Sequence, residues 1–229
     1  MKTLGLIGGT TWLSTADYYR IINQQTNQRL GGLNSARMLL YSLNFEEFKP
    51  PADPAAWGSI ADTLSGIATR LETAGAECIV LCASTPHITA DIVQQRISIP
   101  IIHIATATAI TVKAANIKKV ALLGTKYTME QPFFRDRLAQ HDLETIIPPL
   151  ADREFIHHSI YTELAKGIFS SDTRAKYLEI IDRLIAQGAE GIILGCTEIP
   201  LLIKQEDCAV PVFDTTLIHA TAAVDFAIN

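Results

Sequence analysis

The sequence lacks any apolar run long enough to cross a membrane, and it lacks an excess of basic residues. Its longest apolar stretches, at 99–104 and 192–194, are strand-sized, whereas a spanning helix needs about 20 residues. Acidic residues outnumber basic ones by 24 to 19, which gives a net charge of −5. Nucleic-acid binding requires a basic face, so we expect neither nucleic acid nor a membrane as a partner. Met1 leads directly into a strand-like segment, so we expect no signal peptide and a cytoplasmic location.

Cysteine is also scarce, with four in 229 residues. Without a secretory signal the compartment is expected to be reducing, so structural disulfides are not predicted. Cys78 and Cys82 share one strand-like run, in which alternation leaves both thiols on one face. No second ligand pair follows at a spacing that zinc requires, so we predict no metal site. Most of these cysteines are expected to be small buried hydrophobic residues.

The chain does contain a regular alternation of short apolar runs and helical patterns. The strand-like runs are 4–7, 36–42, 78–81, 101–104, 120–123, 191–194 and 210–213. The helical patterns are 14–30, 57–74, 85–96, 105–115, 131–140, 152–166 and 173–187. This alternation predicts βαβ units and an α/β fold with mainly parallel sheets.

An internal repeat is the most informative feature of the sequence. Residues 70–85 and 183–198 are identical at seven of 16 positions, with an offset of 113. Residues 99–103 and 210–214 repeat at an offset of 111, and 4–8 and 120–124 at 116. We interpret these matches as two copies of one α/β unit, although any two βα units resemble each other to some degree. The predicted architecture is two pseudo-symmetric, doubly wound lobes. The first lobe comprises residues 1–104 plus 210–229, and the second comprises 105–209.

The repeat pairs Cys196 with Ala83, since both follow a strand at the point where a helix begins. Two similar lobes can form a cleft between the carboxyl ends of their sheets, so we expect the active site there. A thiol at a helix N-terminus is favoured as thiolate by the helix dipole. Thr197 and Glu198 are placed to hydrogen-bond nearby or to cap the turn. The alternative is that Cys196 is a buried structural cysteine.

Three other strand-end loops offer hydroxyl groups and backbone amides that suit a small anion such as a carboxylate. Their candidate binding residues are Thr10, Thr11, Ser84, Thr85, Thr125, Tyr127 and Thr128. Each loop is alternatively an ordinary turn, with Ser14 and Thr15 as helix caps. His87 is a further polar group near the expected cleft, or a supporting residue. The spacings typical of dinucleotide and P-loop sites are absent, so no nucleotide cofactor is predicted.

Taken in order, these motifs resemble the cofactor-independent aspartate/glutamate racemases, in the wider group with hydantoin racemases and arylmalonate decarboxylases. The resemblance covers essentially the whole chain and is strongest to the enterobacterial-type branch. It depends on the following segments: Gly8-Gly-x-x-Trp-x-Ser-Thr, Tyr18-Tyr19, Ile22-Asn23, Ser84-Thr85-x-His87, Leu123-Gly-Thr-x-Tyr-Thr-Met, Gly195-Cys-Thr-Glu and Pro211-Val-Phe-Asp-Thr.

The resemblance implies a reaction that needs no cofactor. In the family, two cysteines flank the substrate α-carbon, and one removes the proton while the other donates one to the opposite face. Fixed dipoles around the carboxylate must then stabilise the carbanion. Lys166 falls where some members carry a lysine that binds the side-chain carboxylate, although it is alternatively a solvated lysine at a helix end. A homodimer is likewise implied by the family alone.

The chain departs from the family where the first cysteine is expected. The motif Cys-Asn-Thr reads Ala83-Ser84-Thr85 here, and alanine cannot exchange a proton. Cys82 is adjacent, but one step along a strand end points a side chain the other way. Some relatives have threonine at this position, which at least keeps a hydroxyl. Thr10 and Leu13 replace the methionine and glutamate that are usual in this branch.

Three functions follow from these observations. The first is an amino-acid racemase acting on aspartate, glutamate or a similar small amino acid, with Cys196 as the proton-transfer group. Water or Cys82 would then serve the face of Ala83. The second is a single-cysteine decarboxylase or lyase, in which one thiol protonates a carbanion. The third is a non-catalytic protein that binds an amino acid or a dicarboxylate.

Overall fold

The computed structural model describes residues 1–48 and 56–229, and these form two α/β units. Unit 1 comprises Met1–Ile104 with His219–Asn229, and unit 2 comprises Ala105–Ile218. Each unit holds one four-stranded sheet, ordered β2-β1-β3-β4 in unit 1 and β6-β5-β7-β8 in unit 2. All strand pairs are parallel. The predicted α/β class with two parallel sheets is confirmed.

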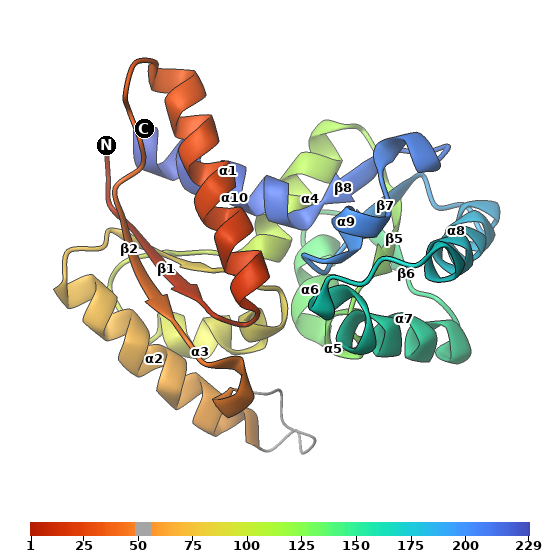
Figure 1. Cartoon of the computed structure of the whole chain (residues 1–229), viewed down its shortest axis with the longest axis horizontal. Coiled ribbons are helices and arrows are strands. Elements are labelled where there is room, and N and C mark those ends of the chain that lie inside the picture. Colours follow the sequence, from red (N-terminus) through yellow and green to blue (C-terminus); the bar gives the residue numbers. More distant parts are fainter. Residues whose placement is uncertain (49–55) are drawn as a thin grey trace. The chain divides into compact units, whose positions relative to one another are not determined.

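Unit 1 is a three-layer arrangement around its sheet. Its elements are β1 (Leu4–Gly8), α1 (Trp12–Leu30), β2 (Met38–Ser42), the 3-10 helix η1 (Phe45–Glu47), α2 (Trp57–Thr73), β3 (Cys78–Leu81), the 3-10 helix η3 (Thr85–Thr89), α3 (Ala90–Gln94), β4 (Ile101–Ile102) and most of α10 (Thr215–Ile228). Helices α1 and α10 cover one face of the sheet, and α2 and α3 cover the other (Figure 1). The predicted helix over 85–96 is two short pieces, η3 and α3.

Alternation along β3 explains why both faces of this sheet are covered. Val80 and Cys82 pack with α1 and α10, whereas Ile79 and Leu81 pack with α2 and α3. All four side chains are at most 1% exposed. Cys78 shares the face of Cys82, as predicted. Burial raises the pKa of Cys78 to about 12 and raises that of Cys82 still further, so both are protonated core residues.

Unit 2 repeats this arrangement of strands. Its elements are α4 (Ile104–Ala114), β5 (Lys119–Leu123), α5 (Lys126–Glu130), α6 (Pro132–Ala139), β6 (Glu144–Ile146), α7 (Leu150–Thr162), the 3-10 helix η4 (Leu164–Lys166), α8 (Ser171–Ala186), β7 (Gly191–Leu194), α9 (Ile199–Leu202), the 3-10 helix η5 (Gln205–Asp207) and β8 (Val212–Asp214). Helices α7 and α8 pack on the face of the sheet that carries Leu123 and Leu194. The edge strand β6 is absent from the sequence prediction because it has only three residues, one of them an exposed glutamate.

The register of the two sheets agrees with the internal repeat. Leu4 pairs with Cys78 in unit 1, and Val120 pairs with Gly191 in unit 2. These two pairs are related by the offsets of 116 and 113 that relate the two sequences. The repeat therefore describes two sheets with the same strand order and register.

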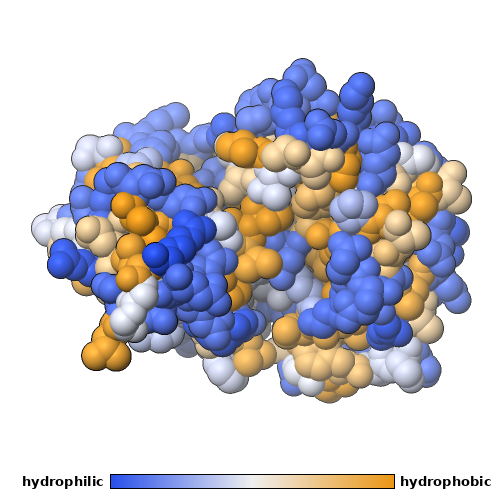
Figure 2. Space-filling model, turned by 90° about the horizontal axis from the view of Figure 1, so that it is seen from above, coloured by the Kyte–Doolittle hydropathy of each residue, from blue (hydrophilic) through white to orange (hydrophobic). Residues whose placement is uncertain are grey.

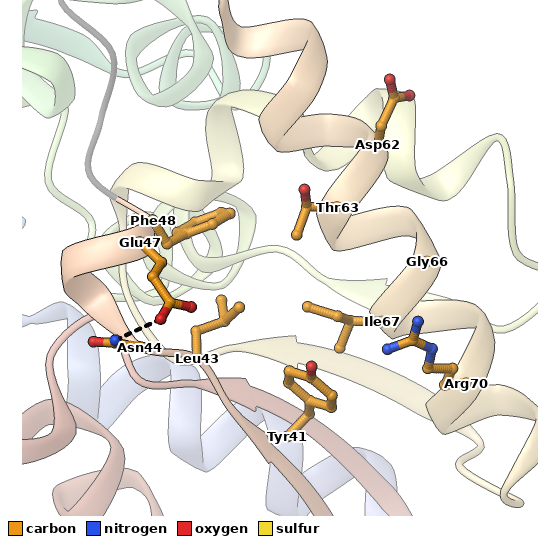
Figure 3. A pocket seen from close by; sticks show the side chains of 10 residues that line it. All are labelled: Tyr41, Leu43, Asn44, Glu47, Phe48, Asp62, Thr63, Gly66, Ile67 and Arg70. Atoms are coloured by element: carbon orange, nitrogen blue, oxygen red, sulfur yellow. Dashed lines mark hydrogen bonds between the residues drawn. The ribbon is translucent and has the colours of Figure 1, made fainter.

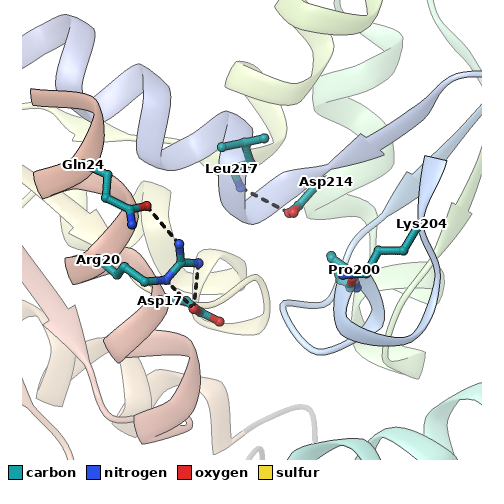
Figure 4. Close-up of polar contacts among 7 residues, drawn as sticks. All are labelled: Asp17, Arg20, Gln24, Pro200, Lys204, Asp214 and Leu217. Carbon is teal, nitrogen blue, oxygen red and sulfur yellow. Dashed lines mark hydrogen bonds and ion pairs between the residues drawn. The ribbon is translucent and has the colours of Figure 1, made fainter. Parts of the chain in front are cut away.

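The second domain boundary differs from the predicted one. Residues 210–218 were expected in the first lobe, but β8 pairs with β7 and belongs to unit 2. The chain enters unit 1 only at His219, within α10. Helix α10 starts directly after β8, where Asp214 Oδ1 accepts the N–H groups of Thr216 and Leu217. Figure 4 shows the second of these bonds.

The surface mixes hydrophilic and hydrophobic side chains (Figure 2). The exposed large apolar side chains include Trp12, Leu33 and Ile110. No helix in the described part of the chain is both long enough and apolar enough to span a membrane.

Leu6 and Leu40 provide a matched test of the sheet in unit 1. They are register partners on neighbouring strands, but Leu6 is fully buried and Leu40 is 48% exposed. We expect Leu6→Ala to lower the free energy of unfolding by about 2–5 kcal/mol and Leu40→Ala by less than about 1 kcal/mol. Urea denaturation followed by circular dichroism measures both. Equal losses in the two variants would contradict the placement of β1 inside the sheet.

Candidate functional site

The Cys196 loop, residues 195–198, begins with a close approach of backbone to backbone. The N–H of Gly195 donates to Leu123 O on the neighbouring strand β5, at 2.6 Å. A Cβ at Gly195 would lie 2.9 Å from that oxygen and 3.0 Å from Thr128 Cγ2. Only glycine permits this approach, and it places Cys196 at the carboxyl end of β7. Helix α9 follows with Pro200 in its first turn, where the missing N–H costs nothing.

Two side chains of the loop share one buried carboxylate oxygen. Cys196 Sγ donates to Glu198 Oε2 at 2.9 Å, and Thr197 Oγ1 donates to the same oxygen at 2.8 Å. Glu198 is 4% exposed and Thr197 is 8% exposed. The predicted role of these two residues in local hydrogen bonding is therefore confirmed.

The electrostatics of Cys196 differ from the sequence prediction. Burial raises the pKa of the Cys196 thiol well above its usual range, and the charge of Glu198 and the hydrogen bond to it raise it further. The backbone N–H groups of Glu198 and Thr197 lower this pKa, but by less. The expected stabilisation of thiolate by a helix N-terminus is wrong, because α9 has only four residues and desolvation outweighs it. The thiol is protonated at neutral pH.

The loop after β5 lies against the Cys196 loop. A Cβ at Gly124 would lie 3.3 Å from Gly195 O and 3.0 Å from Thr128 Cβ. Thr125 Oγ1 accepts the N–H of Thr128 at 3.3 Å and lies 3.3 Å from its hydroxyl. Both threonines are buried. The structure therefore brings these two predicted residues together with the loop of Cys196, but their hydroxyls already contact each other.

Tyr161, which lies near Cys196, and its neighbour His157 are not predicted from the sequence. The rings of His157 and Tyr161 on α7 are 4.9 Å apart, and His157 also meets the ring of Tyr127 at 5.9 Å. Burial raises the pKa of Tyr161, and the charges of Cys196, Tyr127 and Glu198 raise it further. The only signal available in the sequence was the spacing of 157 and 161, which places both on one face of a helix.

Lys166 is exposed in η4, directly before Gly167. The nearby Glu163 is engaged elsewhere, since its Oε2 accepts hydrogen bonds from Ser170 and Thr173. Nothing in the geometry of unit 2 connects Lys166 with the Cys196 loop, so its role in binding stays a prediction.

Hydroxyl groups hold the first loop of unit 1, residues 9–11, and the start of α1 in place by hydrogen bonds. Thr11 Oγ1 caps α1 by accepting the N–H of Ser14 at 3.2 Å. Thr15 Oγ1 instead accepts the N–H of Gly9 at 2.8 Å, and Ser14 Oγ donates to Cys82 O at 2.7 Å. Thr11 is therefore the cap rather than Ser14 or Thr15. Thr10 and Thr11 remain half-buried.

The second loop of unit 1 carries the residues that replace the expected Cys-Asn-Thr. Ala83 is 8% exposed and Ser84 is 5% exposed, whereas Thr85 is half-buried. Within the described residues, the Oγ of Ser84 is buried with no hydrogen-bond partner. Only the five-residue η3 follows, so the unpaired hydroxyl of Ser84 is a better candidate for an anion contact than a helix terminus.

Comparison with known proteins matches residues 7–223 to a family model described as Asp/Glu/Hydantoin racemase. The chain belongs to this family. A candidate Asp/Glu racemase from Yersinia pestis is 50% identical, with a TM-score of 0.94 and 100% of both chains covered. An aspartate racemase homologue from Pyrococcus horikoshii OT3 is 36% identical, with a TM-score of 0.88 and the same coverage. A glutamate racemase from Streptococcus suis is 26% identical over 76% of this chain and 67% of its own length.

This racemase-family chain has four free cysteines, and their environments differ. Cys78 and Cys82 are buried, whereas Cys196 and Cys208 are half-buried. Burial raises the pKa of Cys208 to about 11, and the charges of Asp207 and Asp182 raise it further. Within the described residues, no three histidine, cysteine or acidic side chains are grouped as a metal site would require.

A buried network in unit 1 holds the Ala83 turn. His87 is 1% exposed, and its Nε2 accepts the N–H of Ile104 at 3.2 Å. Its Nδ1 therefore carries the proton and donates to Ala83 O at 2.9 Å. The expectation that His87 is a supporting residue fits this geometry. The turn that carries Ala83 and Ser84 is thus fixed to the start of α4 by a neutral imidazole.

A second buried histidine extends this network. His219 lies 5.3 Å from His87 between ring centres. It donates from Nε2 to Ile102 O at 2.7 Å, so its Nδ1 accepts the hydroxyl of Tyr18 at 2.8 Å. Burial lowers the pKa of His219 to about 3, and burial followed by the charge of His103 lowers that of His87. Both rings are neutral at pH 7.

These lowered pKa values predict a loss of stability in acid. An unfolded histidine titrates near 6.5, so below that pH the unfolded chain binds protons that folded His219 does not. The stabilising contribution is fully present above pH 6.5 and is lost as the pH falls. From pH 7 to pH 5, His219 alone is expected to lower the free energy of unfolding by about 2 kcal/mol.

The measurement is urea denaturation at both pH values for wild type, His219→Gln and His158→Gln. We expect His219→Gln to be less stable at pH 7 but to lose less stability on acidification. His158 is exposed and serves as the matched control, so its variant should keep the wild-type pH dependence. The same pH dependence in all three proteins would contradict the lowered pKa of His219.

The Cys196–Glu198 pair predicts how thiol reactivity responds to a charge change. Because Glu198 raises the pKa of Cys196 by charge and hydrogen bond, we expect Glu198→Gln to lower it. Alkylation of Cys196 by iodoacetamide at pH 8.5 should then become severalfold faster, as followed by peptide mass spectrometry. Cys208 in the same samples is the internal reference and should not change. An unchanged Cys196 rate would show that the carboxylate does not act on the thiol.

Proposed function

We propose that this chain is a cofactor-independent amino-acid racemase in which Cys196 transfers the α-proton of a small acidic amino acid. Aspartate and glutamate are the first candidates, because family members and relatives are described as acting on them. The observation that carries the proposal is the hydrogen bond from Cys196 Sγ to the buried Glu198 Oε2 at 2.9 Å. A thiol beside a buried carboxylate has a group with which it can exchange its proton.

The pair accounts for proton transfer in both directions. As a base, Cys196 first passes its proton to Glu198, and the resulting thiolate then removes the α-proton, so that both groups are protonated. As an acid, the protonated thiol gives its proton to the α-carbanion, whose electron pair forms the new C–H bond, while Glu198 keeps its own proton. Glu198 then returns that proton to Cys196, which restores the thiol and the carboxylate. Two adjacent negative charges are unfavourable in a buried site, and in this sequence the pair never loses both protons.

The position of Ala83 makes the proposed reaction asymmetric. Ala83 is the counterpart of Cys196 in the repeat and has no proton to exchange. Cys82 packs in the core with α1 and α10 at 1% exposure, and burial raises the pKa of its thiol. We therefore assign the second proton transfer to water rather than to Cys82. Inversion is expected to be slow relative to exchange at Cys196.

The hydroxyl groups of unit 1 support binding of a carboxylate. Ser84 Oγ is buried and has no partner within the described residues, and leaving it so costs about 1–3 kcal/mol. A bound carboxylate oxygen would satisfy it. Thr10, Thr11 and Thr85 are half-buried beside the same two strand ends and offer further contacts. Lys166 stays a candidate for the side-chain carboxylate, and the homodimer and the cytoplasmic location stay predictions.

A single-cysteine decarboxylase is the second candidate, and the protonated state of Cys196 favours it. Loss of CO₂ generates the carbanion without a base, so only one proton donor is needed. No group is then needed to replace the cysteine that is missing at Ala83. Release of CO₂ from disubstituted malonates tests this alternative. Binding of an amino acid that is recovered unchanged would instead indicate a non-catalytic binding protein.

The experiment that tests the racemase is α-proton exchange in deuterated water with both enantiomers of aspartate and glutamate. We expect wild type to incorporate deuterium and Cys196→Ser to lose at least about 100-fold in rate, since general acid–base groups contribute 10²–10⁴. Cys208→Ser is the matched control and should exchange normally. Proton NMR follows exchange, and chiral chromatography follows inversion.

A gain of inversion in Ala83→Cys would support Ala83 as the position of the missing partner. The proposal fails if wild type exchanges neither enantiomer of either substrate, or if Cys196→Ser exchanges at the wild-type rate.

A further inference from the structure

A groove in unit 1 has no part in the site described above. It lies between α2 and the segment that runs from the end of β2 into η1 (Figure 3). Its volume is about 480 Å³, within the range of small-molecule sites. We call it the α2 groove. Leu43 and Ile67 line it with apolar surface, and Tyr41 contributes its ring and hydroxyl.

Helix α2 leaves this groove open at one residue. Gly66 lies in the interior of the helix, where glycine weakens helical structure. A Cβ there would meet no atom within 4 Å, so the space above Gly66 is part of the opening. Ile67, its neighbour, is 3% exposed and forms the floor. The groove thus combines a fixed apolar floor with an unobstructed helical wall.

One basic and two acidic side chains line the groove, and they differ in the partners that they contact. Arg70 extends its guanidinium towards Ile67 (Figure 3), and among residues 1–48 and 56–229 it has no hydrogen-bond or ion-pair partner. Asp62 pairs with Arg96 at 2.5 Å, so its charge is already matched. Glu47 accepts a hydrogen bond from the neutral amide of Asn44 at 2.9 Å, and it lies beside Phe48 at the other end of the groove from Arg70 (Figure 3). The charge available next to Ile67 is therefore that of Arg70.

We propose that the α2 groove binds a small amphipathic carboxylate, with its anionic group on Arg70 and its apolar body over Leu43 and Ile67. A guanidinium presents two parallel N–H groups that match a carboxylate. The hydroxyl of Tyr41 is a further donor beside it. The proposal does not rest on the racemase activity, since the groove shares no residue with the Cys196 loop.

The test is titration of the ¹⁵N-labelled full chain with 3-phenylpropanoate, followed at the amides of Thr63 and Ile67. Phenethylamine, which keeps the ring but carries a cation, is the matched probe. We expect saturable shifts with 3-phenylpropanoate, with a dissociation constant on the order of millimolar, and none with phenethylamine. Arg70→Gln should weaken binding about fivefold, as for the loss of one exposed charge pair.

Two further variants locate the binding. Gly66→Leu adds a side chain on the groove wall, where a Cβ meets no atom within 4 Å, and should abolish the shifts. Gly58→Leu on the same helix should not, because Gly58 is exposed and does not line the groove. Arg37→Gln is the control for charge. Cys196→Ser should bind normally, so failure of the racemase proposal leaves this result unchanged. No shifts with 3-phenylpropanoate, equal shifts with phenethylamine, or full binding by Arg70→Gln would each overturn the proposal.

Discussion

The hydrogen bond from Gly195 N–H to Leu123 O is the contact on which the candidate site depends. It draws the end of β7 against β5 so closely that no side chain fits at Gly195. Cys196 therefore leaves the sheet at a fixed point, and the following turn returns Glu198 beneath its thiol. Gly124 adds to this arrangement from the neighbouring strand, since a Cβ there would lie only 3.0 Å from Thr128 Cβ and 3.3 Å from Gly195 O. Two glycines thus position a cysteine and a glutamate that are two residues apart in the sequence and hydrogen-bonded to each other.

Burial then decides the chemistry of that pair. A thiolate beside a buried carboxylate would place two like charges in a medium that solvates neither. Burial, the charge of Glu198 and the hydrogen bond to it therefore raise the pKa of the Cys196 thiol well above its usual range, and the thiol keeps its proton. Thr197 reinforces this by donating a second hydrogen bond to Glu198 Oε2, which stabilises the carboxylate as the acceptor. This protonated state is what the reaction that we propose requires of Cys196 as a proton donor.

The sequence was sufficient for the fold class, because buried parallel strands are short apolar runs and repeats preserve their spacing. It was also sufficient to place Cys196 at a strand end. It was not sufficient to predict the protonation state of Cys196, because the desolvation of this thiol depends on which residues of unit 2 pack around it. The contact of Tyr18 with His219 joins residues that are 201 positions apart, and no local pattern could reveal it. The boundary between the two units at His219 could not be predicted either, because α10 continues unbroken across it.

The two repeats hold their strand-end turns by different means. In unit 2 the turn is fixed through a glycine N–H, which leaves the side chains of Cys196 and Glu198 to face each other. In unit 1 the turn is fixed through the carbonyl of Ala83, to which His87 donates. A neutral imidazole between Ala83 and Ile104 supplies geometry but no exchangeable charge near pH 7. The duplicated fold therefore keeps both turns in place while only one retains a proton donor. In the reaction that we propose, this asymmetry is the physical reason for proton exchange at Cys196 to outpace inversion.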